Sequence, residues 1–224
     1  MGVKMYFENG EINLYYEKTG QGNPIILLHG NGEDHKIFDV VTKQLAPNYT
    51  VYAIDSRDHG KSSEVETLNY ADMSEDVVAF IRELNIENPI LLGFSDGGII
   101  GLLTAIKCPD LLSKLIVIGT NTSPKVIKKR WLIIMKMVYF FTRNRKFKLM
   151  LRQPNITTSE LNSIVTPTLV LAGSKDVIPN SHTKYIAENI SNSVVKILDG
   201  ENHVSYVLNS EKLYNIILPF LEME

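Results

Sequence analysis

The sequence predicts an α/β fold in which a mostly parallel, twisted β-sheet is covered by helices on both faces. Short apolar runs of strand length alternate along the chain with segments whose apolar residues recur at helical spacing. Strands that alternate with helices favour a parallel sheet between two helical layers. The chain has 224 residues, of which 44% are hydrophobic and 21% are charged. We therefore expect a single domain over residues 1–224.

The elements are expected in a regular order. Strands at 4–8 and 12–18 should form a hairpin, because Asn9-Gly10 between them is typical of a tight turn. A helix near 72–84 is indicated by apolar residues at helical spacing. The other expected strands are 24–28, 50–55, 89–94, 114–118, 167–172 and 194–198, and the other expected helices are 35–46, 98–107, 181–190 and 205–222.

The segment Gly93-Phe-Ser95-Asp-Gly97 has the pattern of a nucleophile elbow. It follows a buried-strand run and precedes an apolar helix. A serine at the apex of such a strand-to-helix turn adopts a strained backbone conformation, and bulky residues two positions away would collide. The helix that follows would direct its N-terminus at negative charge that develops near the serine. Ser95 is therefore the candidate nucleophile.

A serine needs an imidazole as base and a carboxylate to orient it. Asp176 lies just beyond the strand expected at 167–172, and His203 follows the strand expected at 194–198. Both sit where ligands bind in open α/β sheets, beyond the carboxyl ends of strands. Asp176 is the candidate acid and His203 the candidate base. Asp110 is the alternative acid, although its place before the strand at 114–118 is poor.

A glycine-flanked turn at 29–32, His-Gly-Asn-Gly, ends the strand expected at 24–28. One backbone N–H of this turn and the backbone N–H of Asp96 would be two donors aimed at the same oxygen, which is an oxyanion hole. Together with Asp-Ser-Arg-Asp-His-Gly-Lys-Ser at 55–62, Gly-Ser-Lys-Asp at 173–176 and Glu-Asn-His at 201–203, these motifs resemble the serine hydrolases of the α/β-hydrolase superfamily. The resemblance spans residues 24–203. It implies the α/β-hydrolase fold with a short helical cap, a triad of Ser95, Asp176 and His203, and oxyanion donors from Asn31 and Asp96.

Two residues depart from the commonest pattern of that family. Asp58 stands where glycine is usual, and we interpret it as a structural variant. Asp96 follows the nucleophile, where methionine or glutamine is common. Its carboxylate either caps the helix or pairs with a nearby Lys or Arg, or it faces the substrate pocket and attracts a cationic group such as the amino group of an amino-acid ester.

Residues 121–165 lie between two expected strands, where this family inserts its cap. From 125 to 152 there are ten Lys or Arg residues and no acid, so this segment carries +10 and the remainder, with 13 basic and 25 acidic residues, carries −12. We expect 125–152 to be mainly helical. The apolar run at 131–141 either packs over the sheet, lines a substrate pocket, or rests weakly on an anionic membrane surface. The expected pocket residues are Trp131, Met135, Tyr139 and Phe140.

No cofactor or metal is expected. The sequence has neither a dinucleotide-binding glycine motif nor a phosphate-binding loop, and its other histidines (His29, His35, His59 and His182) have no partner at metal-ligand spacing. The charge alone would allow nucleic-acid binding, but no recognition motif accompanies it, so none is expected. The start of the sequence reads as a strand and not as a leader, which favours a cytoplasmic protein. The oligomeric state stays open.

Three classes of function compete. The leading hypothesis is a serine esterase that acts on a small or medium-sized apolar ester through an acyl-enzyme intermediate. The second is carbon–carbon bond hydrolysis, a lyase reaction or perhydrolysis on the same triad. The third is a non-catalytic ligand receptor of the same fold. Serine at position 95 speaks against the epoxide-hydrolase and haloalkane-dehalogenase branches, whose patterns place aspartate there.

Overall fold

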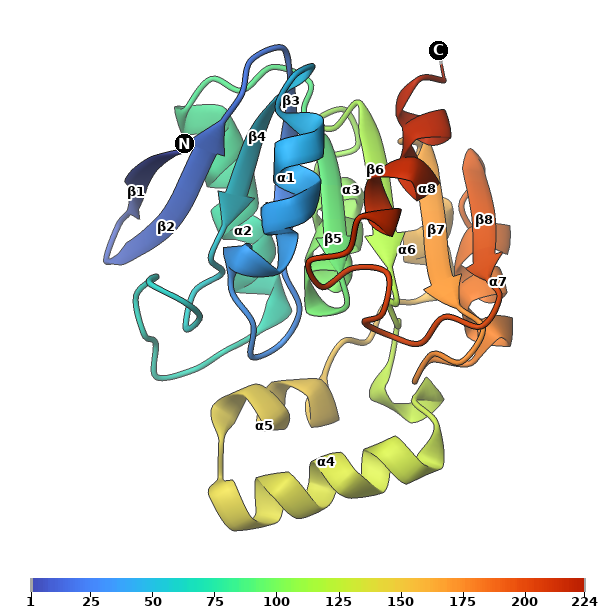
Figure 1. Cartoon of the computed structure of the whole chain (residues 1–224). Helices are drawn as coiled ribbons and strands as arrows, with labels where there is room; N and C mark the ends of the chain where they lie inside the picture. Colours follow the sequence, from blue (N-terminus) through green and yellow to red (C-terminus); the bar gives the residue numbers. More distant parts are fainter. Residues whose placement is uncertain (1, 224) are drawn as a thin grey trace.

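An eight-stranded sheet forms the centre of the computed structural model, which describes residues 2–223 (Figure 1). Its strand order is β1-β2-β4-β3-β5-β6-β7-β8. The pairs β1–β2 and β2–β4 are antiparallel and the five other pairs are parallel. The strands are β1 (Val3–Asn9), β2 (Ile12–Thr19), β3 (Asn23–Leu28), β4 (Tyr49–Ile54), β5 (Ile90–Phe94), β6 (Lys114–Ile118), β7 (Thr168–Gly173) and β8 (Ser193–Leu198). This architecture confirms the predicted fold class.

Helices cover both faces of the sheet, and each face has its own apolar core. One core joins the sheet to α1 and α8, and the other joins it to α2, α3 and α7 (Figure 1). The inner strands are apolar on both sides because both sides are buried, as in β5, where all five residues are buried. The helices outside the cap are η1 (His35–Phe38), α1 (Asp39–Leu45), α2 (Tyr70–Glu83), α3 (Asp96–Lys107), α7 (Asn180–Glu188) and α8 (Lys212–Leu221).

The expected helix at 205–222 is wrong in its first half. Residues 203–208 form bends and turns, and α8 begins only at Lys212. Asn202 holds this turn, since its side-chain oxygen accepts from the backbone N–H groups of Val204 and Ser205. Asn209 has φ 46°, which a continuous helix does not allow. The segment therefore serves as the loop that carries His203, while Tyr206 and Val207 are buried in the core with α8.

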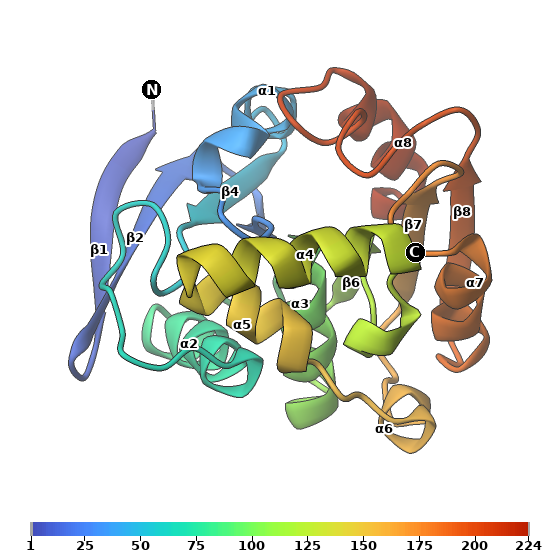
Figure 2. The same cartoon turned by 90° about the horizontal axis from the view of Figure 1, so that it is seen from below.

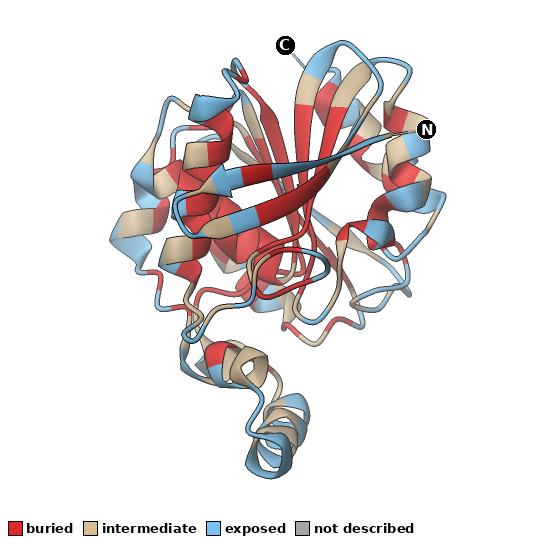
Figure 3. Ribbon diagram, turned by 90° about the vertical axis from the view of Figure 1, so that its left-hand side faces the viewer, coloured by how far each residue is buried: buried red, intermediate tan, exposed pale blue. Residues whose placement is uncertain are grey.

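The cap lies between β6 and β7, at the carboxyl edge of the sheet (Figure 1). It contains η2 (Pro124–Val126), α4 (Lys129–Thr142), α5 (Arg145–Arg152) and α6 (Thr158–Asn162), so the prediction of a mainly helical 125–152 is confirmed. Viewed from below, α4 crosses the sheet edge with α5 beside it (Figure 2). Coloured by burial, the strands are mostly buried, whereas the protruding cap is mostly exposed or intermediate (Figure 3). No residue of α4 is buried.

Candidate active site

Ser95 occupies a sharp turn between β5 and α3. Its φ of 52° is uncommon for a residue with a side chain, and such strain is typical of functional turns. The turn needs glycine on either side. A Cβ on Gly93 would lie 2.1 Å from the carbonyl oxygen of Gly97, and a Cβ on Gly97 would lie 2.1 Å from that of Leu28. The Ser95 N–H donates to the Ile118 carbonyl at 2.7 Å, which anchors the turn to the end of β6.

The structure brings Ser95, His203 and Asp176 into one hydrogen-bonded chain. His203 Nε2 lies 3.2 Å from Ser95 Oγ, and His203 Nδ1 lies 2.8 Å from Asp176 Oδ1. Asp176 is completely buried and also accepts from the Ile178 N–H. The Lys128 ammonium of the cap donates to the Asp176 carbonyl, which ties the cap to the loop of this carboxylate. This arrangement holds the imidazole in the tautomer with its proton on Nδ1.

Among the backbone N–H groups around Ser95, the two expected oxyanion donors have no acceptor within residues 2–223. They belong to Asn31, in the turn after β3, and to Asp96, the first residue of α3. The N–H of Gly30 is by contrast engaged by Glu33 Oε2 at 3.0 Å. Asn31 therefore has an unengaged backbone N–H, and its side chain donates to Asp96 Oδ2 at 2.8 Å. The two residues that were expected to supply the oxyanion hole lie side by side.

The Asp96 carboxylate is buried beside the nucleophile. Its hydrogen-bond partner is the Asn31 amide; it neither caps α3 nor forms an ion pair within the part of the chain that the structure describes. Burial raises the pKa of Asp96 to about 6, although the hydrogen bond from Asn31 acts in the opposite direction. The group is thus ionised at neutral pH and protonated in mild acid. It lines a pocket together with Ser95 and His203.

Two pockets open at Ser95 and His203. One, of about 110 Å³, is lined largely by apolar side chains, which include Trp131 and Met135 of α4. The other, of about 410 Å³, runs along the 30–33 turn and the start of α5, where Lys146 lies at its border. The Ser95 hydroxyl thus stands between a narrow apolar pocket and a wider, more polar one.

The cap residues expected in the pocket divide by helix face. Residues are about 100° apart around a helix, so Trp131 and Met135 share a face and Phe140 points away from it. Trp131 and Met135 line the smaller pocket, whereas neither Tyr139 nor Phe140 lines either pocket at Ser95. Phe140 is 64% exposed and packs edge-on against Phe141. The expected placement in the pocket therefore holds for Trp131 and Met135 and is wrong for Tyr139 and Phe140.

Sequence patterns do not reveal several residues that the fold adds to this site. Tyr70 at the start of α2 and Gln153 after α5 line the smaller pocket, and their contact is a hydrogen bond from the Tyr70 N–H to Gln153 Oε1 at 3.2 Å. Met150 lines both pockets. None of these residues belongs to a recognisable motif. Their placement follows from how the cap folds back over the sheet edge.

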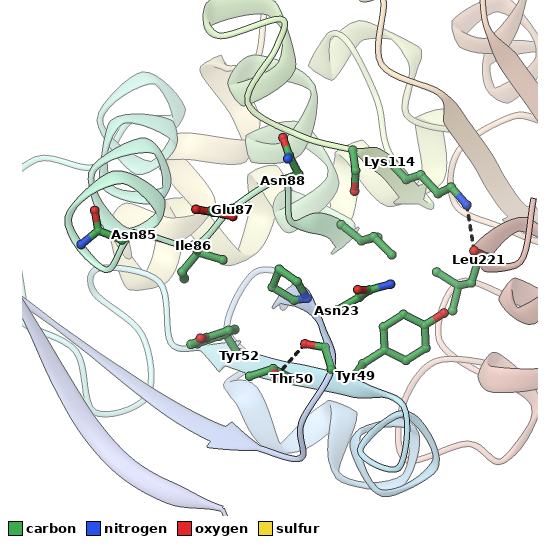
Figure 4. A pocket seen from close by; sticks show the side chains of 14 residues that line it. Asn23, Tyr49, Thr50, Tyr52, Asn85, Ile86, Glu87, Asn88, Lys114 and Leu221 are labelled. Atoms are coloured by element: carbon green, nitrogen blue, oxygen red, sulfur yellow. Dashed lines mark hydrogen bonds between the residues drawn. The ribbon is translucent and has the colours of Figure 1, made fainter. Parts of the chain in front are cut away.

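A third cavity, of about 670 Å³, lies at the opposite edge of the sheet (Figure 4). Asn23, Tyr49 and Lys114, near the amino ends of parallel strands, line it, and the Lys114 ammonium donates to the Leu221 carbonyl at 2.7 Å. It is larger than either pocket at Ser95. Ligands of open α/β sheets bind at the carboxyl edge, however, so size does not make this cavity the candidate site.

The remaining histidines have structural partners. His29 Nε2 accepts from the Ser56 N–H at 3.0 Å, and burial lowers the pKa of His29. Burial also lowers the pKa values of His59 and His182 to about 4. Ligand atoms of Asp34, His35 and Asp55 lie within 4.8 Å of one another. Both Asp55 oxygens already accept hydrogen bonds, from His35 and from the Lys61 N–H, so this cluster gives no positive indication of a metal.

Asp58 adopts φ 64°, the left-handed region that glycine prefers. This conformation explains why glycine is usual at the position. Asp58 is nearly buried, and its carboxylate accepts from Arg145 of α5. The interpretation of Asp58 as a structural variant stays a prediction, but the ion pair gives it a specific role as an anchor of the cap.

None of the helices within residues 2–223 is long and apolar enough to cross a bilayer.

Comparisons with known proteins point to one family. A family model described as the alpha/beta hydrolase fold matches residues 23–148. The AB hydrolase superfamily protein YisY of Bacillus subtilis is 27% identical over 93% of this chain and 95% of its own length. The pimeloyl-[acyl-carrier protein] methyl ester esterase of Aliivibrio salmonicida is 29% identical over 49% of this chain and 40% of its own length. Several other curated matches cover only 28–37% of the relative's length.

Solved structures agree on the fold. The esterase EaEST from Exiguobacterium antarcticum superposes with a TM-score of 0.86 at 20% identity, over 99% of this chain and all of that one. The family match confirms the predicted membership of the α/β-hydrolase superfamily, and several of the curated relatives are named as esterases or lipases. The chain belongs to the alpha/beta hydrolase family.

Proposed function

We propose that this protein is a serine esterase that hydrolyses a carboxylic ester through an acyl-enzyme intermediate. The observation that carries the proposal is the hydrogen-bonded chain from Ser95 through His203 to Asp176, with distances of 3.2 and 2.8 Å, at the mouth of an apolar pocket. The strained backbone of Ser95 supports it, because strain of this kind concentrates at functional sites.

In the proposed first half-reaction, Ser95 Oγ attacks the ester carbonyl carbon while His203 Nε2 takes the hydroxyl proton. The C–O bond to the alcohol then breaks, and His203 returns that proton to the departing oxygen. The buried Asp176 carboxylate stabilises the transient imidazolium. In the second half-reaction, His203 takes a proton from water, the hydroxide attacks the acyl-enzyme, and Ser95 leaves with the proton restored.

The proposed oxyanion donors are the backbone N–H groups of Asn31 and Asp96. Both are unengaged within the described residues, so they can turn to the developing negative charge without first breaking a protein hydrogen bond. Preorganised donors of this kind lower the barrier by roughly 3–4 kcal/mol each. The Asn31 side-chain amide donates to the Asp96 carboxylate, so this contact uses neither of the two backbone N–H groups.

The pockets support a small or medium-sized apolar ester. The pocket of about 110 Å³ has room for a short apolar group against Trp131 and Met135. The wider pocket of about 410 Å³ would receive the other half of the ester. Because the wider pocket is bordered by polar groups, we assign the acyl group to the narrow pocket and the alcohol to the wide one.

A fluorophosphonate probe and a panel of p-nitrophenyl esters with increasing acyl length test this proposal. We expect Ser95 to be labelled and short to medium acyl chains to be preferred. Ser95→Ala, Asp176→Asn and His203→Ala should each reduce turnover by about three or more orders of magnitude with an unchanged fold. Asp110→Asn is the matched control and should retain activity. Near-full activity of Asp176→Asn would show that the acid is misassigned.

The alternatives make different predictions in the same assays. A carbon–carbon hydrolase, lyase or perhydrolase would be labelled by the probe but would turn over p-nitrophenyl esters poorly at every chain length. A ligand receptor would show no turnover. A cytoplasmic location and the absence of a nucleic-acid partner remain predictions.

A further inference from the structure

The face of α4 that points away from the pocket exposes large apolar side chains. Ile133, Ile134, Met137, Phe140 and Phe141 are between 47% and 77% exposed. At about 100° per residue they occupy a continuous arc of about 120° on the helix surface. Trp131, on the pocket side of the same helix, is 38% exposed, and the other large exposed apolar side chains of residues 2–223 lie outside the cap helices. A concentrated apolar patch of this kind is typical of an interaction surface.

Basic residues border this arc. Lys129 and Lys136 lie along one edge of it by helical angle, and Arg130 lies at its N-terminal end. Of the ten Lys and Arg residues in 125–152, only Arg145 forms an ion pair with an acid of the chain as far as the structure describes it. The segment contains no acid, and the remainder of the chain has 13 basic and 25 acidic residues. The net positive charge is therefore confined to 125–152, where ion pairs with acids leave it largely uncompensated.

The position of α4 leaves this surface free to meet a flat partner. The helix protrudes from the carboxyl edge of the sheet, and none of its residues is buried (Figures 1 and 3). Its opposite face, with Trp131 and Met135, lines the pocket at Ser95. An apolar arc with basic edges is the pattern of helices that lie in the interface of an anionic bilayer. Nucleic acid fits less well, because five apolar side chains occupy the centre of the surface.

We propose that α4 docks this protein onto anionic lipid bilayers, with its apolar arc in the headgroup region and its basic residues on lipid phosphates. Docking would place the pocket entrance next to the membrane surface. An anionic surface would repel the acidic remainder of the chain and attract the basic cap. The long-range field therefore orients the molecule before contact.

Co-sedimentation of the full-length protein with vesicles tests this proposal. The probes are vesicles of phosphatidylcholine alone and of phosphatidylcholine with phosphatidylglycerol in equal parts. We expect binding only to the anionic vesicles. Binding should weaken at least tenfold between about 0.1 M and about 1 M NaCl, because the screening length falls from about 10 Å to about 3 Å.

Two double variants separate the apolar and electrostatic contributions. Met137→Ser with Phe141→Ser removes two exposed apolar side chains, and Lys129→Glu with Lys136→Glu reverses two edge charges; each should weaken binding about tenfold or more. The matched controls lie away from the cap. Val3→Ser with Val194→Ser changes exposed apolar side chains of β1 and β8, and Lys43→Glu with Lys184→Glu changes two exposed lysines. Both controls should bind as the unmodified protein does.

Two results would overturn the proposal. One is binding that is equal on neutral and anionic vesicles or unaffected by the cap variants. The other is absence of vesicle binding together with a concentration-dependent dimer, seen by light scattering, that Met137→Ser with Phe141→Ser abolishes; the arc would then be an interface between copies of this chain. Vesicle binding requires no turnover, so its failure is distinguishable from failure of the proposed esterase activity.

Discussion

Asp58 and Arg145 lie 87 residues apart in the chain and form a two-pronged ion pair. Arg145 Nε donates to Asp58 Oδ2 and Arg145 Nη2 to Asp58 Oδ1, both at 2.9 Å. Asp58 is in the loop after β4, and Arg145 opens helix α5 of the cap. The pair therefore connects the cap to the body of the protein at the border of the site. Because the Asp58 side chain is nearly buried, its geometry is more constrained than that of a surface pair.

We predict that Asp58→Asn loosens the cap. Asparagine tolerates the left-handed backbone, so the substitution removes the charge without adding strain. The ten basic residues of 125–152 make limited trypsin digestion a direct measure of cap opening. Cleavage in the cap should accelerate about fivefold or more, as expected for the loss of one or two kcal/mol of tethering. The control is Glu64→Gln, since Glu64 is the second, highly exposed partner of Arg145 at 3.2 Å. Equal cleavage of both variants would exclude a tethering role for Asp58.

The narrow pocket should set the acyl-chain preference. Met135→Trp puts a larger side chain into a pocket of about 110 Å³ and so leaves less room for the acyl group. It should reduce kcat/KM for butyrate or longer esters about tenfold relative to acetate esters. Phe140→Trp is the matched control on the same helix, where the side chain is 64% exposed. It should leave the preference unchanged. A shift in Phe140→Trp as large as that in Met135→Trp would mean that the cap rearranges when substrate binds.

Asp96 should distinguish cationic from neutral substrates. Its ionised carboxylate lines the narrow pocket without a cationic partner in residues 2–223, which favours the hypothesis that it receives a cationic group. We expect Asp96→Asn to lower kcat/KM for an amino-acid ester more than for a neutral ester of matched size, by about 1–3 kcal/mol in activation free energy. An equal loss on both substrates would leave Asp96 only a structural role.

The same carboxyl should make stability depend on pH. The pKa of Asp96 is about 6 in the folded protein, against 3.8 for an aspartate in the unfolded chain. Between these values the folded protein binds the proton more tightly than the unfolded chain does. The stabilisation is therefore complete below pH 3.8 and is lost as pH rises through 6, by about 3 kcal/mol in all.

Asp96→Asn removes this titration. The free energy of unfolding of the variant, measured in urea and compared with that of the unmodified protein, should rise by about 2 kcal/mol between pH 4 and pH 7. Contributions from groups that do not interact with Asp96 are shared by both proteins and cancel. A difference that stays constant with pH would show that Asp96 does not titrate in this range.

Features that depend on neighbouring residues can be predicted from the amino-acid sequence. The glycines at 93 and 97 predict the turn at Ser95. At Gly93 the reason is local, since a Cβ there would meet the carbonyl oxygen of Gly97; at Gly97 the crowding atom is the Leu28 carbonyl oxygen, which the fold brings there. The apolar runs predict the strands, and the order Ser95, Asp176, His203 places three reactive side chains at one edge of a parallel sheet. Most elements are therefore predicted within a few residues.

Contacts between side chains that are distant in the sequence follow from the tertiary structure alone. Asn31 donates a hydrogen bond to Asp96, 65 residues away, and Asp58 forms an ion pair with Arg145, 87 residues away. No local pattern specifies either contact. The helical pattern after His203 was misleading because Asn202 and core burial of Tyr206 hold a turn there. The apolar run of α4 predicts a helix, but it does not predict which face of the helix packs against the rest of the protein. That outcome depends on how the cap packs against the sheet, which leaves Trp131 and Met135 at the pocket and Phe140 in solvent.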